Sequence, residues 1–267
     1  MGALLMIERY LREIDCEILL RELGVADQGS LLKSIKHFSE KEAEERDAIV
    51  QGYFGATGIE AIASNVAESL QSLHENSTIL DVGAGTGFFT VRVAEKLSDL
   101  NPSFYALDVT PAMLLVLVGK LREMEGMPIT VFLGVAEKIA ESVELCNRAY
   151  RPFGIKIPTQ FDAIISVLTL HHCERVKAVF NSIRRGLRDG GRLVLVDLCE
   201  HPFEEFKEEM GDIHLGFNPE EIRLTLSDMF EVEEVEKMPG IRCEESGRAA
   251  ELFIAVAIKS RSAGDGI

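Results

Sequence analysis

Positive charge and aromatic residues are scarce in this sequence of 267 residues. Lysine and arginine number 28 against 44 aspartate and glutamate residues, which gives a formal net charge of -16, and tryptophan is absent. Proteins that bind a nucleic-acid backbone use basic residues to neutralise phosphates and release counterions. The charge therefore disfavours a nucleic-acid partner.

The sequence also lacks a long apolar run and any paired arrangement of cysteines. The apolar residues 1–7 are followed at once by charged residues, which leaves no core of a signal peptide and no membrane-spanning stretch. The five cysteines are odd in number and scattered, without the spacing of a disulfide framework or a metal site. We expect a cytoplasmic protein with no membrane insertion and no metal site.

Hydrophobic residues make up 46% of the chain, which is enough to bury a full core. From residue 77 onward, short β-branched runs alternate with longer segments of helical period, as in a parallel sheet covered by helices on both faces. No clear helix separates the last two runs, and a strand that returns without a crossover helix pairs antiparallel. The pattern predicts an α/β fold with a doubly wound, mostly parallel seven-stranded sheet and an antiparallel C-terminal strand. The strands are expected at residues 78–82, 103–108, 129–133, 161–168, 192–197, 230–237 and 251–259.

Helices are expected around these strands and before them. Residues 1–72 have a mostly helical pattern, with breaks at residues 24–30 and around Gly52, Gly55 and Gly58. We expect a helical N-terminal appendage that serves as a lid or a dimerisation element, a main domain at residues 73–260, and a disordered tail at residues 261–267. The helices of the main domain are expected at residues 86–97, 111–124, 136–147, 174–188 and 219–227.

A glycine-rich turn follows the first expected strand. Residues 81–87 read Asp-Val-Gly-Ala-Gly-Thr-Gly and lead into a helix. Glycines permit a tight turn there and let backbone N–H groups approach a ligand at the helix N-terminus. Dinucleotide sites use a similar loop with the spacing G-x-G-x-x-G, whereas the spacing here is G-x-G-x-G. The turn therefore suits a ligand without a pyrophosphate.

A carboxylate stands at the end of the second expected strand. Asp108 should lie beside the glycine turn, because parallel strands present their carboxyl ends at one edge of the sheet. Its two oxygens can accept hydrogen bonds from both hydroxyls of a ribose. The turn and the carboxylate together indicate a nucleoside ligand.

Four segments in the same order resemble the motifs of class I S-adenosylmethionine (SAM)-dependent methyltransferases, which have a Rossmann-like fold. They are residues 81–87, 107–114, 161–166 and 187–193, and the likeness covers most of residues 75–258. Within that family, the chain is more similar to the quinone and small-molecule methyltransferase branch, through the segments that carry His171 and His201. The resemblance implies SAM as methyl donor, S-adenosylhomocysteine as product, and a small-molecule acceptor that reacts through carbon, oxygen or sulfur.

The resemblance also implies which residues hold SAM. The glycine turn is expected at the methionine part, Asp108 at the ribose, and Leu168 beside the methyl group. The third strand of the family is usually followed by an acid that contacts the adenine amine, but Val135 stands there, so this contact is expected from backbone groups or Glu137. Apart from the resemblance, Tyr53 lies between glycines of the helical appendage and would either close over the cofactor as a lid or dock the appendage onto the sheet. The full expected set is Asp81, Gly83, Ala84, Gly85, Thr86, Gly87, Asp108, Val109, Met113, Val135, Ala136, Glu137, Leu168 and Tyr53.

Three histidines are the candidate catalytic residues. His171, His172 and His201 follow the fourth and fifth strands, at the edge where ligands bind in this class of sheet. Methyl transfer needs chiefly alignment, but a hydroxyl or activated-carbon acceptor also needs a base, and histidine titrates in the useful range. The alternative is that they hydrogen-bond loop carbonyls or cap a helix. Cys173 and Cys199 either bind a soft acceptor or are small buried hydrophobes.

Other interpretations of the same residues stay open. A dinucleotide-dependent oxidoreductase would use the same loop, although the spacing favours SAM. A SAM-binding regulator or scaffold would bind the cofactor without catalysis, its helical appendage engaging a partner or a second copy of the chain as a homodimer. Residues 166–169 lack the Asn-Pro-Pro-Tyr-type motif of enzymes that methylate planar nitrogen, which disfavours a protein or tRNA acceptor. Residues 141–160, longer than most helix-to-strand connections, either shape the acceptor pocket or form a surface loop.

Overall fold

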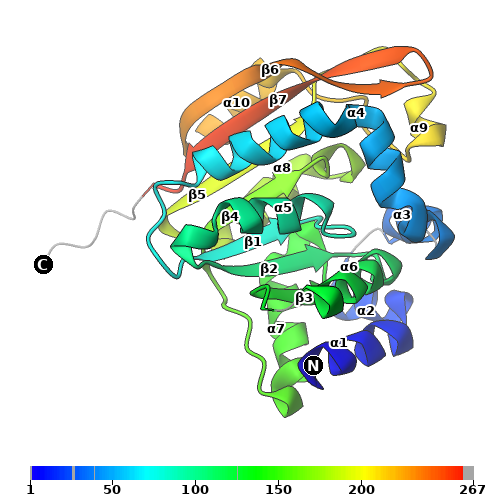
Figure 1. The fold of residues 1–267 in the computed structure, drawn as a ribbon, viewed down its shortest axis with the longest axis vertical. Coiled ribbons are helices and arrows are strands. Elements are labelled where there is room, and N and C mark those ends of the chain that lie inside the picture. Colours follow the sequence, from blue (N-terminus) through cyan, green and yellow to red (C-terminus); the bar gives the residue numbers. More distant parts are fainter. Residues whose placement is uncertain (1, 26–27, 39, 125, 261–267) are drawn as a thin grey trace, which may run out of the picture.

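Seven strands form one sheet in the computed structural model, which describes residues 2–25, 28–38, 40–124 and 126–260. The strand order is β3-β2-β1-β4-β5-β7-β6, and β7 runs antiparallel to both β5 and β6 (Figure 1). This confirms the predicted doubly wound, mostly parallel sheet. The strands are β1 (Thr78–Val82), β2 (Ser103–Asp108), β3 (Ile129–Leu133), β4 (Phe161–Val167), β5 (Leu187–Leu198), β6 (Glu231–Glu245) and β7 (Arg248–Ile258).

The chain reverses its direction of winding between β1 and β4. From β1 it proceeds outward through β2 to β3, then returns to place β4 on the other side of β1. These central strands are apolar runs buried on both faces, as expected for parallel strands covered by helices. A crevice forms outside the carboxyl ends of strands at such a switch point.

Helices between the strands follow the predicted positions with small shifts. The first begins two residues later than expected because the glycine turn occupies the positions before it. The helices are α5 (Phe88–Lys96), α6 (Pro111–Glu123), α7 (Ile139–Tyr150), α8 (Val176–Gly186), the short α9 (Phe206–Glu209) and α10 (Pro219–Ser227). Four 3₁₀ turns join them: η1 (Ser98–Leu100), η2 (Ala136–Lys138), η3 (Arg151–Phe153) and η4 (Leu170–His172).

Of the two alternatives for residues 141–160, the pocket-shaping loop is wrong, and the surface segment holds only for residues 151–160, which are mostly exposed. Helix α7 continues to Tyr150, and η3 follows it directly. Val143, Cys146 and Tyr150 recur at helical spacing and are fully buried, so their burial extends the helix. The Tyr150 hydroxyl donates to the carbonyl oxygen of Val131 at 3.1 Å, on β3 and away from the ligand edge.

Four helices precede β1: α1 (Gly2–Glu13), α2 (Cys16–Glu22), α3 (Gly29–His37) and α4 (Glu40–Ser69). Helix α1 packs against α6 and β3, whereas α4 packs against α5, α6, β5 and β6 (Figure 1). Helix α4 bends at Gly55, whose φ of 59° lies in the region that favours glycine. Buried residues such as Ile62 and Leu70 share one core with the sheet.

No helix of the described residues is long and apolar enough to cross a membrane. The boundary between an N-terminal appendage and a main domain near residue 72 stays a prediction. The expected disordered tail at residues 261–267 lies outside the described residues.

Candidate functional site

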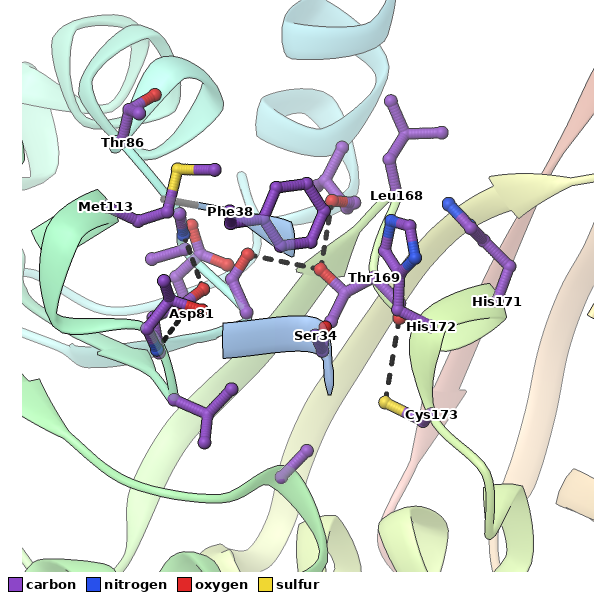
Figure 2. Close-up of a pocket in the computed structure, with 18 of the residues that line it drawn as sticks. Ser34, Phe38, Asp81, Thr86, Met113, Leu168, Thr169, His171, His172 and Cys173 are labelled. Carbon is purple, nitrogen blue, oxygen red and sulfur yellow. Dashed lines mark hydrogen bonds between the residues drawn. The ribbon is translucent and has the colours of Figure 1, made fainter. Parts of the chain in front are cut away.

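A cavity opens outside the carboxyl ends of β1 to β4, and α3 with the first half of α4 forms its outer wall (Figure 2). Every residue predicted to bind SAM lines this cavity except Gly87. His171 and His172 also line it, whereas His201 does not. The fold therefore gathers nearly all of the predicted site at the switch point.

The glycine turn is held against the end of β2. The backbone N–H groups of Gly83 and Ala84 both donate to the carbonyl oxygen of Leu107, at 2.8 and 3.0 Å. Gly83 and Gly85 have φ values of 78° and 54°, a region that favours glycine. The turn is thus a fixed piece of backbone with little freedom to rearrange.

The space around the glycines of the turn differs from one position to the next. A Cβ on Gly83 would lie 2.1 Å from Thr169 Cγ2, and one on Gly87 would lie 2.3 Å from Leu117 Cδ1. No atom lies within 4 Å of the position that a Cβ on Gly85 would take. Gly87 therefore serves the packing of α5 against α6 behind the turn, which corrects its predicted place at the ligand. Gly85 has open space before it, on the cavity side.

Both oxygens of Asp108 are oriented by the backbone. The N–H of Gly85 donates to Oδ2 and the N–H of Thr110 donates to Oδ1, each at 2.8 Å. Burial raises the pKa of Asp108, and hydrogen bonds from Thr110, Gly85 and Val109 oppose the rise. The carboxylate is thus held in one orientation at the edge of the cavity.

Asp81 is a second carboxyl group at the cavity, 2% exposed. Thr90 Oγ1 donates to its Oδ2 at 2.5 Å. Burial raises the pKa of Asp81 to about 7, and the charge of Asp108 contributes to the rise. A cationic group placed beside it would favour its ionised form.

Thr86, in the glycine turn, is tied to both α4 and α6. Its hydroxyl donates to Asp47 Oδ1 at 2.6 Å, and Lys120 Nζ donates to its carbonyl oxygen at 2.9 Å. Lys120 Nζ also pairs with Asp47 Oδ2 at 2.5 Å. We missed Asp47 and Lys120 in the sequence, since 39 residues separate Asp47 from Thr86 and no local motif links them.

The N-terminal helices contribute aromatic side chains to the outer wall. Phe38 packs with Met113, and its ring meets that of His172 edge to face at 5.6 Å (Figure 2). Arg46 lies over the same Phe38 ring, 5.1 Å from its centroid. Tyr53 is 9% exposed, and burial raises the pKa of its hydroxyl to about 12. We had predicted Tyr53, but Phe38 and Arg46 carried no motif that would reveal them.

The segment after β3 brings both backbone groups and the Glu137 carboxyl group to the cavity. The N–H of Val135 already donates to Ser142 Oγ at 3.0 Å, and its carbonyl accepts from the N–H of Lys138. Glu137, by contrast, brings a carboxyl group that is 7% exposed to the cavity, and burial raises its pKa. Of the two options left by the sequence, the geometry favours Glu137 over the Val135 amide.

Leu168 carries backbone strain at the end of β4. Its φ is 55°, which is uncommon for a residue other than glycine. The conformation is held because the N–H of Leu168 donates to the carbonyl oxygen of Val196 at 2.8 Å, and Thr169 Oγ1 donates to the carbonyl oxygen of Gly83 at 3.1 Å. The strained residue thus bends the chain over the glycine turn and into the cavity wall.

His171 and His172 stand next to each other at the far end of the cavity. His171 Nδ1 lies 2.6 Å from Asp197 Oδ1, and His172 Nδ1 lies 3.1 Å from the carbonyl oxygen of Gly211. Burial lowers the pKa of His171, but the charge and hydrogen bond of Asp197 outweigh it, so the pKa is raised overall. Burial and the neighbouring His171 hold the pKa of His172 well below its usual value.

His201 lies outside the cavity, which corrects the expectation that three histidines gather there. Its ring packs on Phe203 and Phe206 at 5.3 and 4.9 Å, and its Nδ1 accepts a hydrogen bond from the N–H of Phe203. Leu198, the last residue of β5, still lines the cavity, but His201 follows three residues later, where its backbone N–H donates to the carbonyl oxygen of Leu215 at 3.0 Å. Burial lowers the pKa of His201.

The two candidate cysteines are both buried. Cys173 lines the cavity and Cys199 does not. Burial raises the pKa of the Cys173 thiol well above its ordinary value and that of Cys199 to about 11. Protonated, buried thiols fit the interpretation as small hydrophobes better than that of soft-acceptor ligands.

Comparison with known proteins gives a domain and a fold. Residues 80–193 match the family model described as a methyltransferase domain. The chain is 28% identical over 163 residues to the highly reducing polyketide synthase PKS6 of Gibberella zeae, covering 58% of this chain and 6% of that protein. It is 27% identical over 157 residues to the ubiquinone/menaquinone biosynthesis C-methyltransferase UbiE of Wigglesworthia glossinidia brevipalpis, covering 59% and 56%. The chain thus spans about half of the second relative and a small part of the first.

Among solved structures, a SAM-dependent methyltransferase from Aquifex aeolicus superposes with a TM-score of 0.58 at 17% identity. The match covers 83% of this chain and 99% of that one. The chain therefore shares the Rossmann-like fold of that protein.

Proposed function

Since residues 80–193 form a methyltransferase domain, we propose that this chain transfers the methyl group of SAM to a small-molecule acceptor. One observation carries the proposal: the glycine turn, Asp108 and Glu137 face a single cavity at the switch point of the sheet. The relatives that match the chain include a quinone C-methyltransferase and polyketide synthases, which supports an acceptor that is a small molecule.

The residues around the cavity fit SAM from end to end. Asp81 suits its ammonium group, because a buried carboxyl with a pKa of about 7 gains from a cation. The open space before Gly85 suits the methionine chain. Asp108 has acceptor capacity for the ribose hydroxyls, and Glu137 can accept a hydrogen bond from the adenine amine. Val109 and Met113 supply apolar surface for the faces of the adenine.

When bound there, SAM supplies an electrophilic methyl group on a sulfonium. The acceptor atom forms a new bond to that methyl, and the electrons of the broken carbon–sulfur bond stay on sulfur, giving S-adenosylhomocysteine. Leu168 and the outer wall exclude water and align the two reactants, which is where most of the rate is gained.

His171 and His172 face the acceptor side of the cavity. In each, Nδ1 lies against an oxygen that can only accept, so Nδ1 carries the proton and Nε2 is free to take one. A hydroxyl, thiol or activated-carbon acceptor can therefore lose its proton to one of these nitrogens. Their role as base is part of the proposal.

Calorimetry tests the cofactor, with SAM and NAD titrated into the same protein. We expect SAM to bind and NAD not to bind. Asp108→Asn should weaken SAM binding strongly, while Asp99→Asn, at an exposed position in η1, should leave it unchanged. Equal affinity of the Asp108 variant and the parent protein would overturn the assignment.

A labelled-methyl assay with metabolite extracts then separates an enzyme from a SAM-binding regulator. Label appearing in a small molecule supports the enzyme, whereas SAM binding without transfer favours the regulator. We further propose a cytoplasmic location, which the five free cysteines support, and no nucleic-acid partner. A homodimer through the N-terminal helices stays a prediction; sedimentation of the full chain tests it.

A further inference from the structure

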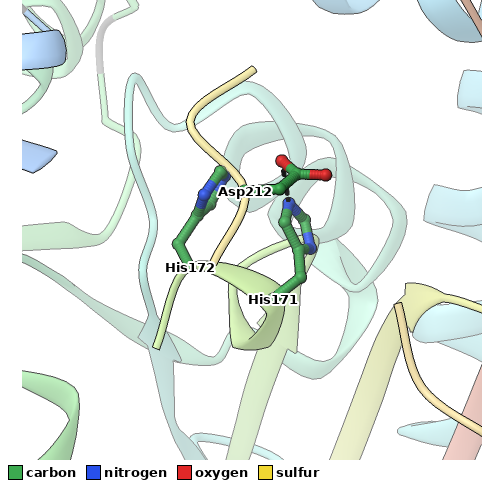
Figure 3. A group of neighbouring side chains, drawn as sticks. All are labelled: His171, His172 and Asp212. Carbon is green, nitrogen blue, oxygen red and sulfur yellow. Dashed lines mark ion pairs between the residues drawn. The ribbon is translucent and has the colours of Figure 1, made fainter. Parts of the chain in front are cut away.

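Two histidines and an aspartate from separate segments meet at the inner end of the cavity (Figure 3). His171 and His172 come from η4 after β4, while Asp212 lies in the connection between α9 and α10. One ligand atom from each of the three residues lies within 4.8 Å of those of the other two. We propose that these three side chains bind one divalent transition-metal ion of the Zn²⁺ type.

Asp212 is the strongest sign of a missing partner. The residue is 4% exposed, and neither of its carboxylate oxygens has a hydrogen-bond partner among the described residues. Buried charges in proteins are normally paired, hydrogen-bonded or bound to a metal. Its one ion pair within the described chain is with His171 Nε2, at 3.6 Å, which is too long for a hydrogen bond.

That same separation suits two ligands of one metal ion. Zn²⁺ binds imidazole nitrogen and carboxylate oxygen at about 2.0–2.2 Å, so two ligands at a tetrahedral angle stand about 3.3–3.6 Å apart. The 3.6 Å between His171 Nε2 and Asp212 Oδ1 lies at the upper end of this range. His172 offers the third ligand atom, and the ligand atoms of all three residues lie within 4.8 Å of one another.

Both imidazoles have the tautomer that a metal requires. His171 Nδ1 donates to Asp197 Oδ1 at 2.6 Å, and His172 Nδ1 donates to the carbonyl oxygen of Gly211 at 3.1 Å. In the neutral imidazole, which is the form that binds a metal ion, each Nε2 is therefore unprotonated. Metal-bound histidines characteristically donate their other ring N–H to a carboxylate or a backbone carbonyl, which fixes the ring orientation.

The segment that carries Asp212 is fastened to the same histidines. The backbone N–H groups of Ile213 and His214 donate to the carbonyl oxygen of His171, at 3.0 and 2.9 Å. Asp197 is fixed in turn, because the N–H groups of Leu170 and Leu198 donate to its two oxygens, each at 2.8 Å. The three candidate ligands are thus held in place before any ion binds.

The alternative is a buried ion pair in which a protonated His171, or Arg46, neutralises the charge of Asp212. Arg46 lies over the Phe38 ring, and Asp212 has no ion pair with it in the described part of the chain. A protonated His171 between Asp197 and Asp212 would be expected to hydrogen-bond both carboxylates, but only Asp197 lies within that distance. The geometry therefore favours an ion over a shared proton.

The donor set and the surroundings define the kind of ion. Two imidazoles and one carboxylate suit Zn²⁺ and its first-row neighbours, whereas Mg²⁺ and Ca²⁺ prefer oxygen ligands. His171 and His172 line the cavity, so a remaining coordination position would face it. If the proposed methyl transfer holds, the ion would activate an oxygen or sulfur acceptor in place of the two histidines, because an Nε2 that binds the ion cannot also take a proton. Ion binding itself does not rest on that function.

Metal binding is measured on the full chain after chelator treatment and dialysis, with Zn²⁺, Mg²⁺ and Ca²⁺ titrated separately. We expect one Zn²⁺ per chain and no binding of the two hard cations. Co²⁺ in place of Zn²⁺ should give a visible absorption band of nitrogen and oxygen ligands. Asp212→Asn should lower Zn²⁺ affinity by about 100-fold or more, exceeding the 10- to 100-fold loss typical when an outer-shell partner such as Asp197 is replaced.

His74→Gln is the control, because its side chain is 70% exposed and it lies outside both the cavity and the cluster, so Zn²⁺ affinity should stay unchanged. His172→Gln, which removes a second proposed ligand, should also lower Zn²⁺ affinity. Circular dichroism checks that each variant is folded. If His172→Gln does not fold, Asp212→Asn alone still tests the proposal. The proposal is overturned if Asp212→Asn binds Zn²⁺ as tightly as the parent protein, or if the parent protein binds no Zn²⁺ at micromolar concentration. A Co²⁺ spectrum typical of cysteine ligands would also overturn it. SAM binding is titrated separately, without metal. A failure of the proposed methyltransferase function can therefore be distinguished from a failure of the proposed metal site.

Discussion

Thr86 Oγ1 donates a hydrogen bond to Asp47 Oδ1 at 2.6 Å and thereby joins the glycine turn to the N-terminal helix α4. Lys120 from α6 neutralises the same carboxylate. Opening the outer wall of the cavity along α4 requires this contact to break. The strength of the contact therefore bears on how long a ligand stays bound.

Asp47→Ala should weaken SAM binding by roughly fivefold, corresponding to about 1 kcal/mol for a partly exposed, charged hydrogen bond. The loss should lie mainly in faster dissociation, because α4 opens more readily. Stopped-flow fluorescence and calorimetry measure the two quantities. Glu44→Ala, at an exposed position of the same helix, is the control. An unchanged dissociation rate in the Asp47 variant would show that α4 does not retain the ligand.

The raised pKa of Asp81 leads us to expect that SAM binding depends on pH. Burial raises its pKa in the free protein to about 7, above that of an unfolded chain, so the protonated carboxyl stabilises the fold at low pH. That stabilisation is lost as the pH rises through 7, where the ionised carboxylate is buried without a cation. The SAM ammonium needs the ionised form, so affinity should fall roughly eightfold from pH 7.5 to pH 6.

Calorimetry at the two pH values checks this, together with proton uptake measured in buffers of different ionisation enthalpy. Asp81→Asn should bind SAM weakly and with little pH dependence between them. A parent protein whose affinity is equal at pH 6 and pH 7.5 would rule out the pairing of Asp81 with the ammonium group.

Gly83 and Gly85 should respond differently to alanine. Both have positive φ, so alanine costs roughly 1–2 kcal/mol at either position. At Gly83 the new Cβ would also meet Thr169 at 2.1 Å, so the protein should lose stability beyond that amount. At Gly85 it would enter open space, so the fold should survive while SAM affinity drops roughly tenfold or more by steric exclusion. Thermal unfolding with and without SAM measures both, and equal stability of the two variants would contradict the packing argument.

The sequence predicts those parts of the molecule that depend on local pattern. The strands β1, β2 and β3 have the predicted bounds, because each is a short apolar run between turn residues. The start of β5 was missed, since residues 189–191 contain two glycines and have the composition of a turn. The glycine turn and Asp108 are visible because their chemistry is set within a few residues of a strand end.

Residues that reach the cavity by long-range packing are not visible in the sequence. Phe38 directly follows α3 and Arg46 lies in α4, and the docking of these helices decides which side chains face inward. Asp212 lies about 40 positions after the histidines, in a loop without a motif. His201 follows a strand as expected, but Leu198 at the end of that strand lines the cavity and His201, three residues later, does not. The packing of its ring on Phe203 and Phe206 is not visible in the sequence.

Glu137 gives a prediction with opposite effects on stability and binding. Its carboxyl is 7% exposed, and burial raises its pKa, so holding the ionised group inside the protein weakens the fold. Glu137→Leu should therefore raise the melting temperature of the free protein. It should also lower SAM affinity about 10- to 100-fold, because a hydrogen bond to a charged group contributes about 1.5–3 kcal/mol. Glu144→Leu, on the exposed face of α7, should change neither quantity much. Scanning calorimetry measures the melting temperature and SAM titration measures the affinity. If the Glu137 variant binds SAM as tightly as the parent protein, another group recognises the adenine.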